Sequence, residues 1–224
     1  MSKTAANMIE VSTQARPQAD RKRREERWEE ILEAAAEVFY EKGYEAATLQ
    51  EIADRVGILK GSIYYYIKTK GDLLDNLLVG VHTEGLAMMR ECAATEGSIF
   101  DKLAAMIRGH IDYMSRNQSK TSVYLHELKA LGPEHRGRLF RSHDFRDEFL
   151  ALLKQGRDEG LVATNLDPKL TAQTILGWVN SLYQWYTPKR QMGTGTIADH
   201  FTFIMLRGIA TQKGLKQLAD WEKR

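Results

Sequence analysis

The sequence predicts an all-α protein with a short helix-turn-helix domain near its N-terminal end and a larger helical domain after it. Apolar residues recur at helical spacing along most of the chain, and no segment alternates with the two-residue period of a strand. Residues 48–70 have the pattern of two short helices joined by a tight turn. At 224 residues the chain has room for two such domains. We expect an unstructured arm over residues 1–20, the helix-turn-helix domain over 21–70 and the second domain over 71–224.

The composition is that of an ordinary globular protein, with 43% hydrophobic and 28% charged residues. No segment reaches the roughly 20 consecutive apolar residues of a membrane span, and the N terminus carries no apolar signal segment. The lone cysteine, Cys92, cannot form an intrachain disulfide, which fits a reducing compartment. We expect a cytoplasmic protein that does not contact a membrane.

The first helix is predicted from about Arg21 to Lys42, where Gly43 ends it. Its apolar stripe consists of Trp28, Ile31, Leu32, Ala35 and Phe39. The segment RKRREER at its start (21–27) has two interpretations. It is either an arm that reaches a DNA groove or phosphate, or a solubilising helix start.

The helix-turn-helix is predicted from local signals. Thr48 and Glu51 have the spacing of a capping box, and Ile52 and Val56 then share one helix face. Gly57 suits the positive φ of the turn. A second helix is expected from about Lys60, with its buried stripe formed by residues 63 and 67.

The exposed residues of the second helix favour DNA. Residues 58–70 contain three lysines and no acid, after a segment, 28–57, with a net charge of −6. Lysine, serine and tyrosine side chains bond phosphates or base edges, and a glycine permits close approach. The alternative is that the three tyrosines only pack a small helical domain. We expect base contacts from Gln50, Lys60, Ser62, Tyr64 and Tyr65, close approach at Gly61, and phosphate contacts from Thr48, Tyr66 and Lys70.

The N-terminal part resembles the tetracycline-repressor (TetR) family of bacterial one-component regulators, over roughly residues 28–78. Two positions depart from the family pattern, since phenylalanine is common at Ile67 and glutamate at Gly71. The resemblance implies a homodimer that binds a palindromic double-stranded DNA operator and releases it when a small-molecule effector binds. The residues that carry it are Phe39, Gly43, Tyr44, Thr48, Ile52, Ala53, Val56, Gly57, Gly61, Ser62, Ile63, Tyr64, Tyr66, Lys70, Leu73 and Leu74.

The rest of the chain is predicted to continue as helices. Ser98 with Asp101, Pro133, and Asp167 with Pro168 mark helix starts. The expected helices cover about 71–92, 98–116, 119–131, 133–160, 167–186 and 196–210, with a short polar helix at the end.

The last two long helices carry broad apolar faces, which predict a four-helix dimer interface. The alternative is a monomer that buries these faces internally. The predicted interface residues are Ile175, Val179, Leu182, Phe201, Ile204, Met205 and Gly208.

The second domain is expected to hold the effector among its helices, although aromatic and methionine side chains, taken one at a time, more often fill an ordinary core. The candidates are Met89, Met106, His110, Tyr113, Tyr124, Glu127, Phe149, Trp178 and Trp185.

The strings YLHELKAL (124–131) and WVNSLYQWYTP (178–188) resemble the TetR branch that responds to acyl-CoA thioesters. Cations for the CoA phosphates would come from Arg136, Arg138, Arg141, Lys189 and Arg190, whose alternative role is solvated surface charge. The alternative is a repressor of the same family whose effector is a drug or an aromatic compound.

Two other classes of protein fit the sequence poorly. An all-α enzyme lacks its usual signals, because no HExxH or CxxC motif occurs and Cys92 has no identifiable base partner. A non-specific architectural DNA binder would not need a large apolar second domain. We therefore expect no enzymatic activity, no metal and no cofactor.

Overall fold

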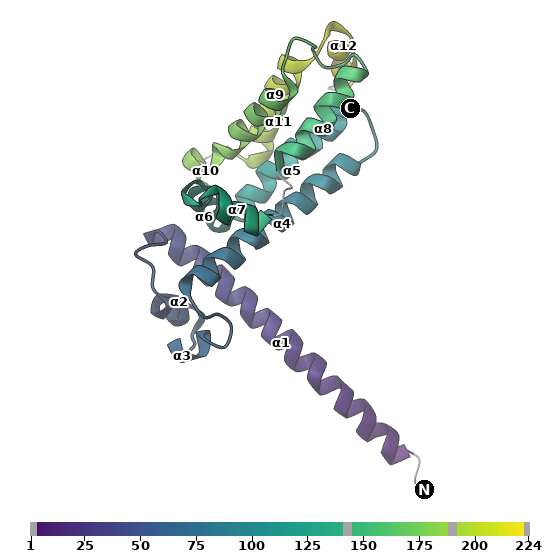
Figure 1. Cartoon of the computed structure of the whole chain (residues 1–224). Coiled ribbons are helices and arrows are strands. Elements are labelled where there is room, and N and C mark those ends of the chain that lie inside the picture. The colour runs from purple at the N-terminus through teal and green to yellow at the C-terminus, as the bar shows by residue number, and fades with distance from the viewer. Residues whose placement is uncertain (1–3, 141–144, 188–191, 222–224) are drawn as a thin grey trace. The chain divides into compact units, whose positions relative to one another are not determined.

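A computed structural model of the chain describes the backbone of residues 4–140, 145–187 and 192–221, and the side chains of 20–138, 145–187 and 192–219. Helices α1 to α12 make up this part, and an isolated bridge between Val162 and Ala210 is its sole strand-like pairing (Figure 1). The all-α prediction is confirmed. The chain divides into two compact units, Met1–Leu77 and Leu78–Arg224.

The first unit holds α1 (Thr4–Lys42), α2 (Leu49–Val56), α3 (Lys60–Ile63) and the start of α4 (Lys70–Ala94). Ile31 and Ala35 of α1 are fully buried, and α1 packs on α2. The Thr48–Glu51 capping box forms at the start of α2, and Gly57 ends that helix with φ of 73°. These local signals therefore fold as the sequence predicts.

Two boundaries in this unit differ from the expectation. Helix α1 begins at Thr4 rather than near Arg21. The segment before residue 20 has no apolar stripe with which to pack, but its Ala, Met, Gln and Glu residues still have high helical propensity. Helix α3 spans four residues and continues as turns through Tyr66, with Ile63 and Ile67 both buried.

The second unit is built around α5 (Ile99–Arg116), which packs against α8 (Phe145–Asp158), α9 (Pro168–Asn180) and α11 (Thr194–Ile209) (Figure 1). The Ser98–Asp101 capping box starts α5, and Asp167 caps α9. The remaining helices are α6 (Gln118–Ala130), α7 (Pro133–Phe140), α10 (Leu182–Trp185) and α12 (Gln212–Trp221).

Two predicted helices are each divided in the structure. The helix expected over 133–160 is present as α7 and α8, and residues 141–144 lie outside the described part. The helix expected over 167–186 is interrupted at Ser181, between α9 and α10. Ser181 Oγ donates to the carbonyl of Trp178 (2.7 Å), and such a bond to the preceding turn competes with the regular helix.

No helix in the described part of the chain is long and apolar enough to cross a membrane.

Candidate DNA-binding surface and effector cavity

The exposed residues of the helix-turn-helix gather at α3 and the turn after it. Tyr65 is 81% exposed and Tyr64 is 52% exposed, whereas Ile63 and Ile67 point into the core. Lys60 and Gly61 are also exposed, and a Cβ built at Gly61 would meet no atom within 4 Å. The space beside the Gly61 backbone is therefore empty, and another molecule can approach it closely.

Tyr66 has a different environment from its two neighbours. Its ring stacks on Trp28 of α1, with centroids 6.2 Å apart and planes 10° apart. The guanidinium of Arg24 lies 6.0 Å from the centroid of the same ring. Tyr66 therefore joins the segment 60–66, which we call the reading segment, to α1, while Tyr64 and Tyr65 project outwards.

At the start of α2, two polar side chains are engaged within the helix. Thr48 Oγ1 accepts from the backbone amide of Glu51 (3.3 Å), and Gln50 Nε2 donates to Asp54 Oδ1 (2.7 Å). Hydrogen bonds from Lys42 and then Thr48 lower the pKa of Glu51 to about 2. The cap thus stays intact over a wide pH range.

Lys70 does not have the free ammonium that a phosphate contact requires. Its Nζ donates to the carbonyls of Tyr44 (2.7 Å), Glu45 (3.0 Å) and Ala47 (3.0 Å), and it lies 4.4 Å from the centroid of the Tyr44 ring. All three ammonium protons are engaged, so the predicted phosphate role is wrong in this structure. Lys70 instead stabilises the connection between α1 and α2.

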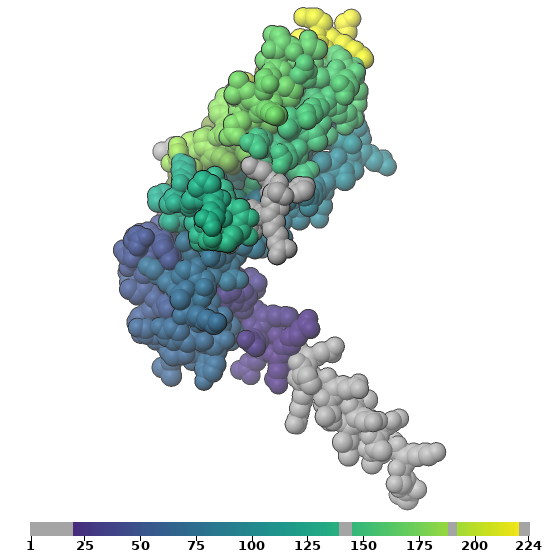
Figure 2. All heavy atoms as spheres, in the orientation of Figure 1, coloured from purple at the N-terminus to yellow at the C-terminus, as the bar shows by residue number. Residues whose placement is uncertain are grey.

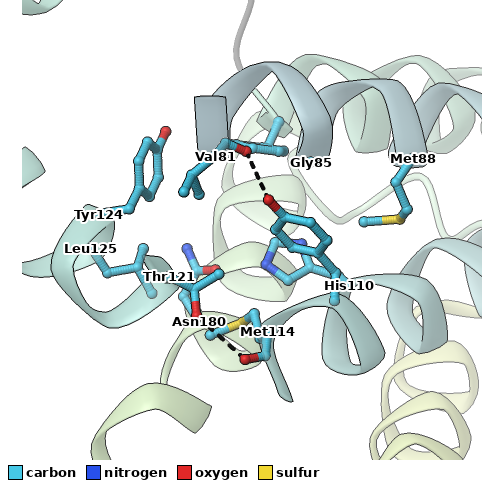
Figure 3. Close-up of a pocket in the computed structure, with 11 residues that line it drawn as sticks. Val81, Gly85, Met88, His110, Met114, Thr121, Tyr124, Leu125 and Asn180 are labelled. Atoms are coloured by element: carbon cyan, nitrogen blue, oxygen red, sulfur yellow. Dashed lines mark hydrogen bonds between the residues drawn. The ribbon is translucent and has the colours of Figure 1, made fainter. Parts of the chain in front are cut away.

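The second unit contains a mostly apolar cavity of about 30 Å³, which is room for about one water (Figure 3). Helices α4, α5, α6, α8 and α9 all contribute to its wall. The lining residues are Val81, Gly85, Met88, His110, Tyr113, Met114, Thr121, Tyr124, Leu125, Phe145 and Asn180.

Several aromatic rings pack against one another beside this cavity. The Phe145 ring packs edge-to-face against His82 (5.1 Å between centroids), His110 (5.9 Å) and Tyr124 (6.3 Å). A Cβ added to Gly85 would lie 2.8 Å from the Phe145 ring, so the ring rests directly on the α4 backbone. The Phe145 ring is thus one wall of the cavity, and it contacts residues of α4, α5 and α6.

Most polar groups of the wall have internal partners. Tyr113 Oη donates to Glu84 Oε2 (2.9 Å), Tyr124 Oη bonds His82 Nδ1 (2.9 Å), and Thr121 Oγ1 donates to the carbonyl of Asn117 (2.9 Å). Burial, followed by the Glu84 carboxylate, raises the pKa of Tyr113, which therefore stays a neutral donor.

His110 is the exception. Its side chain is 93% buried, since the residue is 7% exposed, and Nδ1 has no hydrogen-bond partner in the described part of the chain. Burial lowers its pKa to about 4, against a smaller opposing effect of a hydrogen bond with Asn180. The imidazole is therefore neutral at physiological pH, and it brings one unsatisfied nitrogen to the cavity wall.

The predicted wall residues divide into two groups. His110, Tyr113 and Tyr124 line the cavity. The other six do not: Met89, Met106 and Phe149 are fully buried elsewhere in the core, Glu127 on α6 bonds His126, and Trp178 and Trp185 are 41% and 40% exposed around Phe201. Helical spacing identified apolar positions on each helix, but it does not tell which of them meet across helices.

The predicted cations for CoA phosphates are only partly described. Arg136 Nη2 donates to the carbonyl of Leu128 (2.7 Å) and so caps the end of α6, and Arg138 pairs with Glu134 (3.4 Å). Arg141, Lys189 and Arg190 lie outside the described residues.

The predicted dimer stripe also divides. Val179 and Leu182 are buried within the protomer's own core and are wrong as interface residues. Ile175 and Met205 are buried too, but they line a groove of about 540 Å³ on α9 and α11, together with Trp178, Ile204 and Gly208. Phe201 stacks on Trp178 beside this groove, with centroids 5.5 Å apart. On α9 the outward face therefore carries Trp178 rather than Val179, whereas Ile204, Met205 and Gly208 of α11 line the groove.

Among the described residues, no three His, Cys, Asp or Glu side chains are grouped as metal ligands. A helix-turn-helix unit followed by a helical unit with an apolar cavity defines a DNA-binding regulator with a ligand-binding domain. Two family models match the chain: "Bacterial regulatory proteins, tetR family" over residues 31–77, and "Tetracyclin repressor-like, C-terminal domain" over 96–209. The protein belongs to the TetR family of transcriptional regulators.

Similar proteins are found along most of the chain. The transcriptional repressor KstR2 of Rhodococcus jostii is 27% identical over 184 residues, which cover 81% of this chain and 90% of the relative. The structure of the ketosteroid regulator KstR2 of Mycobacterium tuberculosis has a TM-score of 0.76 and 26% identity, covering 83% of this chain and 96% of that one. AibR, solved in complex with isovaleryl coenzyme A and operator DNA, has a TM-score of 0.71 and 27% identity, covering 80% and 97%.

Proposed function

We propose that this regulator is a homodimeric repressor, and that an acyl-CoA thioester releases it from a palindromic operator. The similarity to KstR2, a named repressor, supports repression, and AibR shows a relative that binds both an acyl-CoA and DNA. The resemblance of two segments in the second unit to acyl-CoA-responsive regulators points the same way.

The observation that carries the effector site is the unsatisfied His110 Nδ1, in a wall whose three hydroxyl groups are bonded internally. A buried polar atom without a partner costs about 1–3 kcal/mol, which a ligand recovers if it supplies a hydrogen-bonding group. The methionine and aromatic side chains around it suit an acyl or ring portion. The cavity therefore selects a mostly apolar group that carries one polar substituent.

A cavity of about 30 Å³ cannot hold an acyl group of several carbons without rearrangement. The Phe145 ring is the group to be displaced, because it lines the cavity, contacts His110 and packs on Gly85 of α4. Helix α4 runs continuously from Lys70 to Ala94. Displacement of the ring at Gly85 would thus act on the same helix that begins in the DNA-binding unit, and the ligand would favour a conformation with lower operator affinity.

For the DNA contacts, we propose that Lys60, Ser62, Tyr64 and Tyr65 enter the major groove, with Gly61 allowing close approach. Gln50 would contribute a further base contact by leaving Asp54, and the Thr48 hydroxyl would bond a phosphate by turning from the Glu51 carboxylate. The Tyr66 hydroxyl would bond a phosphate as well. Lys70 is not included, because its protons are engaged internally.

The proposal is tested by thermal melting of the full chain with CoA thioesters, the matching free acids, free CoA and aromatic drugs. A ligand at a hundred times its Kd adds about 2.7 kcal/mol, or a rise of roughly 5–10 °C for this size of chain. The stabilising thioester should also release a duplex that the protein has selected from a random pool.

Stabilisation by free acids or drugs alone would contradict the thioester proposal and would favour an aromatic or drug effector. A thioester that binds without weakening operator affinity would contradict the release mechanism.

A further inference from the structure

The face of α1 that packs inside the first unit continues toward the N terminus as a row of arginines. Ile31, Ala35 and Phe39 are buried on this face. Steps of three and four residues keep the same face of a helix, and they lead back through Trp28 to Arg24 and Arg21, with Arg27 at its border. Glu25 lies beside Arg21 and pairs with it, whereas the glutamates at 26, 29 and 33 fall on the other sides of the helix.

Contacts within the first unit place this row beside the proposed DNA-reading segment. Trp28 stacks on Tyr66, and the Arg24 guanidinium approaches the same ring at 6.0 Å. Tyr66 directly follows Tyr65, the most exposed aromatic residue of the described chain. Arg24 of the row therefore lies beside Tyr66, the last residue of the reading segment.

The cations of the row are available to an external anion. Residues 20–26 are all exposed, and Figure 2 shows the first described side chains of α1 at the surface. Arg21 pairs with Glu25 at 2.9 Å, but both side chains are more than 60% exposed. Exposed pairs of this kind contribute about 0–1 kcal/mol, so a phosphate competes for the guanidinium at small cost.

We propose that Arg21 and Arg24 bind DNA phosphates next to the groove that α3 enters, and that α1 thereby enlarges the DNA-binding surface. This inference rests on the proposed function. DNA is the occupant because the row is cationic, it adjoins the reading segment through Tyr66, and guanidinium forks match phosphate oxygens. Phosphate contacts strengthen binding to any duplex, and they leave the preference for the operator to α3.

Arg21→Gln tests the proposal, and Lys22→Gln is its matched control. Both changes remove one positive charge, at adjacent exposed positions that each pair with the glutamate four residues later, but Lys22 points about 100° away from Arg21 around α1 and so lies outside the arginine row. Binding of the full chain to the selected duplex and to a scrambled duplex is measured by fluorescence anisotropy from 50 to 300 mM salt.

Each phosphate contact contributes roughly 0.9 to the slope of log K against log salt. Arg21→Gln should therefore flatten the slope of a dimer by about 1.8 on both duplexes, while Lys22→Gln leaves it near the wild-type value. Arg24→Gln should act like Arg21→Gln, and melting curves check that the fold is kept despite its contact with Tyr66.

Equal slopes for the Arg21 and Lys22 variants, in a protein that prefers its selected duplex, would overturn this inference alone. A wild-type protein that binds the selected and scrambled duplexes equally would overturn the proposed function instead.

Discussion

The ring of Phe145 rests directly on Gly85, so closely that a Cβ at Gly85 would lie 2.8 Å from the ring edge. The same ring makes edge-to-face contacts with His82, His110 and Tyr124. One aromatic side chain from α8 thus fills the space between α4, α5 and α6. The proposed mechanism requires an effector to displace this ring, which also packs the cavity wall.

Replacing Phe145 by alanine should separate these two roles. Loss of the ring should lower the free energy of unfolding by about 3 kcal/mol, through lost burial and an enlarged cavity. The variant should bind a cavity ligand more tightly, because no ring has to be displaced. Urea unfolding and ligand titration measure the two effects.

Phe149→Ala is the control for that experiment. Phe149 lies one turn further along α8 and is fully buried, but it does not line the cavity. It should be destabilising without a gain in affinity. If Phe145→Ala bound the ligand with unchanged or lower affinity, the ring would be a ligand contact rather than a group that blocks the cavity.

His110 should make stability depend on pH. Its pKa of about 4 lies below the ordinary value of 6.5, so the unfolded chain binds more protons between these two pH values. The stabilisation is complete above pH 6.5 and is lost as the pH falls toward 4. At pH 5 the loss should be about 2 kcal/mol per chain.

The comparison is between wild type and His110→Gln, by urea unfolding at pH 7.5 and pH 5. The variant retains a polar side chain but does not titrate, so the extra acid sensitivity of the wild type should disappear. The same pH dependence in both proteins would show that burial does not hold His110 neutral.

The sequence predicts those parts of the structure whose signals involve residues close together in the chain. The helix-turn-helix was predicted because its signals are local: Thr48 with Glu51, Gly57, and two isoleucines four residues apart. The cavity was predicted only in part, since Phe145 meets Gly85 through tertiary packing that no spacing within one helix reveals.

The outer helices show a second limit. Helix α9 is apolar on two sides, with Ile175 and Val179 inward and Trp178 outward. Hydrophobic periodicity finds such a helix, but it does not distinguish the core face from an apolar surface face. Burial of the side chains in the folded protomer makes that distinction, which explains the displaced dimer prediction.

The geometry of Lys70 predicts a role in stability rather than in DNA binding. Lys70→Met keeps the apolar stem and removes three hydrogen bonds to carbonyls at 44, 45 and 47, which should cost about 1–2 kcal/mol. Well below the melting temperature, the salt dependence of DNA binding should stay at the wild-type value. If the salt slope of Lys70→Met were flatter by about one unit per protomer, the result would indicate that Lys70 contacts a phosphate after all.

Tyr65 should contribute to operator preference and little to folding. At 81% exposure its removal leaves no cavity, so Tyr65→Ala should change the free energy of unfolding by less than about 0.5 kcal/mol. The ratio of affinities for the selected and scrambled duplexes should fall about tenfold or more, as for a lost base contact. Tyr40→Ala, an exposed tyrosine on α1, is the matched control and should keep the ratio. Equal losses on both duplexes would remove Tyr65 from the base-reading set.

The groove on α9 and α11 should be the dimer contact. It is lined by exposed apolar residues such as Trp178 and Ile204, and patches of this kind mark association sites. Ile204→Arg places two charges in a symmetric interface, where they face each other without partners, so the protein should become monomeric and lose affinity for a palindromic duplex. Val79→Arg introduces the same charge at an apolar residue of similar exposure, 37% against 39%, that does not line the groove. Light scattering gives the mass of each variant: a monomer for Ile204→Arg with a dimer for Val79→Arg supports the groove, and a dimer for both places the interface on another face.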